Sequence, residues 1–119
     1  MVKRTLKNIV PYSKPKNKLI IRSTYYESLI DILDYGIENF GKTVVKNFIR
    51  DIRKQLILLV QFPDANPKCR FIESTENKIY RNIILKSYYI IYSVKSNEIT
   101  VIDIIHQSVS PANMKKKVE

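Results

Sequence analysis

The chain has 119 residues, of which 45% are hydrophobic and 27% are charged, and its formal net charge is +10 at pH 7. This length allows one globular domain with a single core, and the sequence contains no apolar run of about 18 residues, as a membrane-spanning helix would need. Only one cysteine, Cys69, and one histidine are present. We therefore expect a cytoplasmic protein without a disulfide, a metal site or another cofactor.

Most of the positive charge lies near the two ends of the chain. Residues 1–18 carry six basic side chains and no acidic one, and three consecutive lysines, Lys115–Lys117, lie near the C-terminus. These patterns predict a basic N-terminal extension over residues 1–17, a globular domain over 18–111 and a basic C-terminal tail over 112–119, with both ends mobile. Basic ends attract polyanions without sequence preference; alternatively, they only keep the protein soluble.

The first elements of the domain are a strand and a helix. The stretch KLIIRS, residues 18–23, is typical of a strand, and TYYE follows it. Thr24 and Glu27 have the spacing of a capping box, in which each side chain accepts a hydrogen bond from the backbone N–H of the other residue at the start of a helix. Gly41 is placed where the helix would stop. The apolar face of this helix is expected to contain Tyr26, Leu29, Ile30, Leu33, Ile37 and Phe40.

A second helix is predicted over residues 42–60, because Pro63 prevents its continuation. Its buried stripe is expected to contain Val45, Phe48, Ile49, Ile52, Leu56, Leu59 and Val60. The short link makes the two helices antiparallel neighbours. The outer face of the second helix is basic and includes Lys46, Arg50 and Arg53. Such a face is either merely solvated or a surface that contacts phosphates.

Three antiparallel strands are expected over residues 79–85, 88–94 and 98–106. Two-residue turns would pair Leu85 with Tyr88 and Arg81 with Tyr92, and would place Ile105 beside Tyr88. The turn at Lys86 is unusual, because neither of its residues favours a positive φ. A longer turn would move Arg81 to the opposite face of the sheet.

One face of this sheet is expected to pack under the helices, and the other to be covered by a partner. The second face has an apolar centre and a polar rim, which is more apolar surface than solvent-facing sheets usually expose. It is expected to contain Tyr80, Asn82, Ile84, Tyr89, Ile91, Ser93, Thr100, Ile102, Ile104 and His106.

The order of these elements resembles the RelE/ParE superfamily of toxins from type II toxin–antitoxin systems. Four stretches carry the resemblance: NFGKTVVKNFIRDI, FPDANP, YRNIILKSYYIIYSV and ITVIDIIHQSVSP. The resemblance implies an α+β fold with an N-terminal strand, a helical hairpin and a three-stranded antiparallel meander. It also implies a cognate antitoxin encoded nearby, and one of two targets: messenger RNA on the ribosome, which RelE-like members cut, or DNA gyrase, which ParE-like members poison.

The residues at the expected nuclease positions favour the gyrase target. A ribonuclease must stabilise extra charge on a phosphate, yet Tyr89 stands where the RelE-like pattern has an arginine, and Gln107 follows His106 where basic residues are common. If the protein is nevertheless a ribosome-dependent endoribonuclease, Arg81 and His106 are its candidate catalytic residues. The alternative roles are structural: an ion pair of Arg81 with Asp103, and a hydrogen-bonded strand-end histidine.

A third possibility is a binding module that has the toxin fold but no toxicity of its own. In all three cases we expect a surface that contacts the antitoxin or the target. The residues assigned to that surface are Tyr89, Ile91, Lys86, Gln107, Lys46, Arg50 and Arg53. No role at a membrane is expected.

Overall fold

The structure is a computed structural model and describes residues 17–118, so the predicted basic extension lies almost wholly outside the described residues. Its elements are β1 (Lys18–Ile21), α1 (Ser23–Phe40), α2 (Lys42–Gln61), β2 (Ile79–Leu85), β3 (Tyr88–Lys95), β4 (Glu98–His106) and α3 (Pro111–Val118). The expected order of strand, helical hairpin and meander is confirmed. The last helix was not expected.

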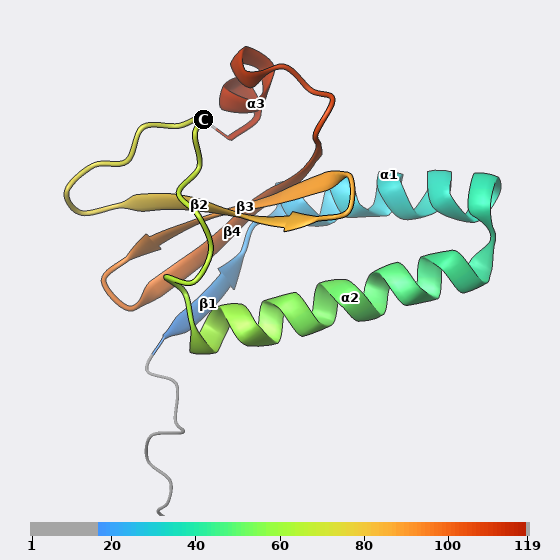
Figure 1. Cartoon of the computed structure of the whole chain (residues 1–119), viewed down its shortest axis with the longest axis horizontal. Helices are drawn as coiled ribbons and strands as arrows, with labels where there is room; N and C mark the ends of the chain where they lie inside the picture. Colours follow the sequence, from blue (N-terminus) through green and yellow to red (C-terminus); the bar gives the residue numbers. More distant parts are fainter. Residues whose placement is uncertain (1–16, 119) are drawn as a thin grey trace, which may run out of the picture.

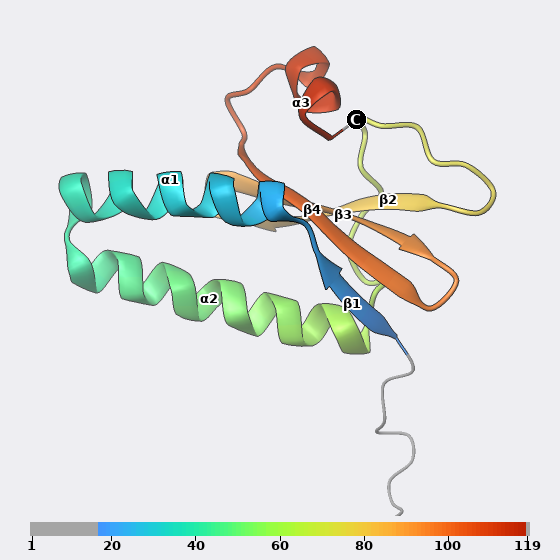
Figure 2. The same ribbon diagram turned by 180° about the vertical axis from the view of Figure 1, so that it is seen from behind.

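The four strands form one sheet in the order β1-β4-β3-β2, in which β1 runs parallel to β4 and the other pairs are antiparallel. Helices α1 and α2 lie on one face of the sheet and α3 lies on the other (Figures 1 and 2). Cys69, Phe71 and Ile72, from the segment between α2 and β2, pack on the same face as α3. The sheet is therefore buried on both faces, and the fold is α+β with two apolar clusters.

The helical hairpin turns at Gly41, whose φ of +89° is a conformation that residues with a Cβ rarely adopt. The expected stripe of α2 is confirmed, with Val45, Phe48, Ile52 and Leu59 buried. The expected face of α1 is partly wrong. Tyr25 is 1% exposed and enters the core, whereas Tyr26 is 50% exposed.

The predicted capping box at the start of α1 is also wrong. Arg22 precedes the helix, and among residues 17–118 no side-chain hydrogen bond caps it. The hydroxyl of Thr24 instead donates a hydrogen bond of 2.7 Å to the carbonyl of Ile102 in β4. The side chain thus ties the helix to the sheet rather than closing its first turn.

The pairing of β2 with β3 is as expected, with Leu85 opposite Tyr88 and Arg81 opposite Tyr92. Lys86 accommodates the two-residue turn by adopting a φ of +55°. The pairing of β3 with β4 differs after Val101, because a bulge makes Ile102 an extra residue. An extra residue reverses the faces that follow it, so the expected placement of Ile105 beside Tyr88 is wrong.

The bulge assigns the last residues of β4 to faces opposite to those expected. Ile104 packs in the cluster under α1 and α2, and Ile105 packs in the cluster on the other face. His106 pairs with Tyr88, and the ring of Tyr88 also contacts Phe48 of α2. His106 therefore belongs to the helix side of the sheet, and the expectation that it lies on the second face is wrong.

The second face of the sheet is covered by the chain itself. Met114 and Val118 of α3 are buried against Ile91, Ile102 and Ile105. The C-terminal segment is consequently a docked helix rather than the mobile tail that the lysine run indicated. The apolar centre of this face, attributed to a partner, is an intramolecular core. Ile91 is 0% exposed, so its assignment as a contact residue is wrong.

Candidate binding surfaces and the residues that form them

Arg81 anchors the loop that follows α2. Its side chain is 17% exposed, and its Nη1 donates a hydrogen bond of 2.6 Å to the carbonyl of Asn66. Its Nε lies 3.9 Å from a carboxylate oxygen of Asp64, whose side chain is 82% exposed. The expected ion pair with Asp103 does not form among the described residues, because Asp103 lies opposite Ile91 on the other face of the sheet from Arg81. Arg81 therefore holds a loop.

Tyr92 holds the same loop from the neighbouring strand. Its hydroxyl donates to the carbonyl of Pro63 over 2.8 Å and accepts from the amide of Asn66 over 3.2 Å. Desolvation by burial raises the pKa of Tyr92, and the hydrogen bond with Asn66 and the charge of Arg81 oppose this effect. Arg81 and Tyr92 thus form a loop anchor, the name used below for this pair.

His106 is exposed at the far end of β4. Its Nδ1 accepts a hydrogen bond of 3.0 Å from the backbone N–H of Ser108, and the hydroxyl of Ser108 lies 2.7 Å from the same nitrogen. A backbone N–H can only donate, so the neutral ring carries its proton on Nε2. The edge of the ring packs on Tyr88. These contacts describe a hydrogen-bonded histidine at the end of a strand.

The two candidate catalytic residues do not form one site. Arg81 pairs with Tyr92, and His106 with Tyr88, which pairs with Leu85. The two positions are four residues apart along β2, about 13 Å, and two strands apart across the sheet, about 10 Å. A single phosphodiester cannot contact both side chains.

Beside His106, the β2–β3 turn and the residue after β4 form an exposed polar end of the sheet. The side chain of Gln107 donates to the carbonyl of Lys86 over 3.1 Å, and its backbone N–H donates to the carbonyl of Ser87. Lys86 and Gln107, both expected at a contact surface, are therefore brought together. We call these residues with His106 the turn cluster.

The basic row on α2 is exposed along its whole length. It contains Lys46, Arg50 and Arg53, and within residues 17–118 none of them has a carboxylate partner. Arg50 donates instead to the side chain of Asn47 over 2.8 Å. The row lies on the helical hairpin and not on the turn cluster, so the contact residues inferred from the sequence belong to separate surfaces.

Apolar side chains also line the solvent side of the hairpin. Tyr26, Ile30, Ile37 and Phe40 of α1 are each about half exposed or more, and they follow one another at spacings of whole helical turns. The hairpin extends well beyond the sheet (Figure 1). An apolar row of this kind is a recognised feature of surfaces that bind an amphipathic helix.

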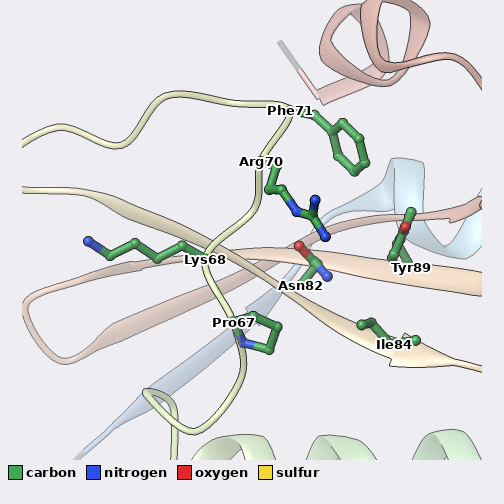
Figure 3. Close-up of a pocket in the computed structure, with 7 residues that line it drawn as sticks. All are labelled: Pro67, Lys68, Arg70, Phe71, Asn82, Ile84 and Tyr89. Atoms are coloured by element: carbon green, nitrogen blue, oxygen red, sulfur yellow. The ribbon is translucent and has the colours of Figure 1, made fainter.

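A pocket of about 240 Å³ opens beside β2, on the face away from α1 and α2. Its lining consists of Pro67, Lys68, Arg70, Phe71, Asn82, Ile84 and Tyr89 (Figure 3). Tyr89 is the one expected contact residue in this lining, and its ring packs against Phe71. Lys68 and Arg70 were not predicted from the sequence as site residues. Their signal in the sequence was two cations beside Phe71, directly after Pro67.

Comparisons with known proteins agree with this architecture. Residues 19–111 match the family model described as the ParE toxin of the type II toxin–antitoxin system parDE. A solved structure titled a chromosomal ParDE toxin–antitoxin system from P. aeruginosa is similar in fold, with a TM-score of 0.61 and 18% sequence identity. The similarity covers 76% of this chain and 95% of the other. No curated protein matches the chain.

The architecture is thus a ParE-like α+β fold, with a helical hairpin packed on an antiparallel meander. Because the family model matches most of its length, the chain belongs to the ParE toxin family of type II toxin–antitoxin systems. Among residues 17–118, no helix is long and apolar enough to cross a membrane.

Proposed function

We propose that this protein inhibits growth by poisoning DNA gyrase, and that a ParD-type antitoxin binds it and prevents this. The observation that carries the choice of target is the separation of Arg81 from His106, together with the use of Arg81 in the loop anchor. A nuclease of the RelE type needs cations close together around one phosphate. A protein that acts by binding to gyrase does not need them.

The turn cluster is the proposed gyrase contact. Lys86, Gln107 and His106 are exposed and polar at one end of the sheet. The side chains of Gln107 and His106 are hydrogen-bonded, and the carbonyl of Lys86 accepts the bond from Gln107. Such a rigid polar end presents donors at fixed positions. The exposed apolar row of α1 is the proposed docking surface of an antitoxin helix, because its side chains follow one face of the helix. The basic row of α2 would add a nonspecific attraction for acidic partners or DNA.

The test is a cleavage assay with purified components. Plasmid DNA, gyrase, ATP and the full chain are incubated, protein is removed by detergent and protease, and linear DNA is quantified. We expect linear DNA that increases with toxin and depends on gyrase and ATP. The double variant Lys86→Ala/Gln107→Ala should lower the yield at least about tenfold, because two polar contacts of roughly 1 kcal/mol each are lost.

The matched control is Lys95→Ala/Asn97→Ala at the opposite turn of the sheet, which is also exposed. It should cleave as the wild type does. A parallel reaction with translating ribosomes should show no cut messenger RNA. Cut RNA without gyrase cleavage would replace this proposal with the nuclease, and an inert wild-type protein in both reactions would replace it with a binding module.

A further inference from the structure

The pocket beside β2 contains a largely buried polar side chain that has no hydrogen-bond partner among the described residues. Asn82 is 6% exposed, and within residues 17–118 only its backbone N–H is hydrogen-bonded, to the carbonyl of Pro67. Buried amides nearly always have partners. The amide of Asn82 and the guanidinium of Arg70 are directed into the same space beside Tyr89 (Figure 3). This space therefore suits a group that accepts hydrogen bonds.

The charge of the pocket defines that group further. Arg70 and Lys68 are its charged lining residues, and within the described part of the chain no acidic side chain lines it. Arg70 lies beside the amide and Lys68 extends away toward the rim (Figure 3). A planar guanidinium next to an amide donor matches the two oxygens of a carboxylate. The pocket is also smaller than the roughly 300–1,000 Å³ of small-molecule sites, so a side chain fits it better than a metabolite.

The edge of β2 next to the pocket is open to an added strand. The carbonyl of Tyr80 and the N–H of Asn82 are paired with the segment Pro67–Cys69. Backbone groups of alternate residues point to the same edge of a strand. The N–H and carbonyl of Ile84 therefore point to this edge as well, beyond the point where Pro67 stops covering it. The side chain of Ile84 is exposed and lines the pocket.

We propose that this pocket is a carboxylate-binding subsite, which receives a Glu or Asp side chain from an extended segment of a protein partner laid along the open end of β2. Arg70 and the amide of Asn82 bind the carboxylate, while Phe71, Tyr89 and Ile84 contact the flanking apolar side chains. The identification of that partner as the antitoxin rests on the proposed function. The apolar walls and the open strand edge favour a peptide over a nucleic-acid phosphate.

The test is an NMR titration of the full, ¹⁵N-labelled chain, and it uses neither gyrase nor toxicity. The probes are the blocked tripeptide acetyl-Leu-Glu-Val-amide, its counterpart with Gln in place of Glu, and inorganic phosphate. We expect the Glu peptide to shift the side-chain amide of Asn82 and the backbone amide of Ile84 in a saturable way. The Gln peptide should bind about tenfold more weakly, because a charge-assisted bond becomes a neutral one.

The variant Arg70→Gln should reduce the affinity for the Glu peptide by a similar factor, and the exposed control Lys95→Gln should leave it unchanged. If Arg70→Gln does not fold, the comparison of the Glu and Gln peptides decides alone. Equal binding of the two peptides, the absence of saturable shifts at Asn82, or tighter binding of phosphate than of the Glu peptide at this position would each overturn the proposal. A failure of gyrase poisoning would leave this result intact.

Discussion

Replacing Arg81 by methionine separates a structural role of this residue from a catalytic one. The change removes the 2.6 Å hydrogen bond to the carbonyl of Asn66 while keeping the aliphatic stem. Loss of a charged hydrogen bond costs about 1.5–3 kcal/mol. The contact with Asp64 adds at most about 1 kcal/mol, because that carboxylate is largely exposed. We therefore expect the free energy of unfolding to fall by about 2–3 kcal/mol.

Tyr92→Phe provides the second arm of this experiment. It removes the hydroxyl that bonds Pro63 and Asn66, and should cost about 1–3 kcal/mol. Arg81 and Tyr92 hold the same loop. The loss of unfolding free energy in the double variant should therefore be smaller than the sum of the losses in the two single variants, with a coupling energy of about 0.5–3 kcal/mol. Urea unfolding, followed by circular dichroism, gives the free energy of unfolding of the wild type, the two single variants and the double variant.

The decisive comparison is between stability and activity. At a temperature where Arg81→Met is fully folded, its gyrase cleavage should equal that of the wild type. If Arg81 instead stabilised a phosphate during RNA cleavage, the change would lower the rate of RNA cleavage by about 10²–10³. The loop-anchor assignment would be refuted if Arg81→Met kept the urea midpoint of the wild type and lost gyrase cleavage or RNA cleavage a hundredfold.

Three further changes test other parts of the structure. Burial raises the pKa of Tyr25 from 10.0 to about 12, and its hydroxyl has no hydrogen-bond partner among residues 17–118. The stability linked to this pKa is full below pH 10 and is lost as the pH rises toward 12. In urea titrations, Tyr25→Phe should therefore be no less stable than the wild type at pH 7 and should lose about 2–3 kcal/mol less stability between pH 10 and 12. Gly41→Ala should cost about 1–3 kcal/mol, because φ +89° with ψ 167° is a conformation that essentially only glycine adopts; a melting temperature equal to the wild type's would contradict this. Met114→Ala should lower the free energy of unfolding by about 2–5 kcal/mol, because the side chain is buried. The exposed control Lys116→Ala should change it by less than about 0.5 kcal/mol. Equal effects of the two changes would mean that α3 is not docked.

The sequence was sufficient to predict the long elements because their patterns are strong. The apolar stripe of α2 and the position of Pro63 determined one helix, and the β-branched runs with two-residue turns determined the meander. The pairing of Arg81 with Tyr92 followed from the turn at Lys86. In that turn Lys86 adopts a positive φ, which lysine disfavours. The strand pairing on both sides of the turn offsets this conformational cost.

The errors arose where tertiary contacts override local patterns. The bulge at Ile102 carries no sequence signal of its own, and it exchanged the faces of Ile104 and Ile105. The hydroxyl of Thr24 donates to the carbonyl of Ile102, in the bulge, instead of capping the helix.

The second face of the sheet was misjudged for a different reason. Its apolar centre correctly indicated that something covers this face. The lysines next to Met114 gave the C-terminal segment the composition of a solvent-exposed tail, so the sequence did not predict that this segment is the cover. Arg70 and Asn82 met in a pocket only because a short bridge ties Pro67–Cys69 to β2. Periodicity cannot reveal such a contact, since the segment is neither a helix nor a full strand.

The most direct test of gyrase as the target is a short induction of the full chain in cells, with labelled precursors of DNA, RNA and protein followed over the first minutes. The proposed function predicts that DNA synthesis fails first and that a DNA-damage response accompanies it. Failure of protein synthesis first, with DNA synthesis still running, would contradict it.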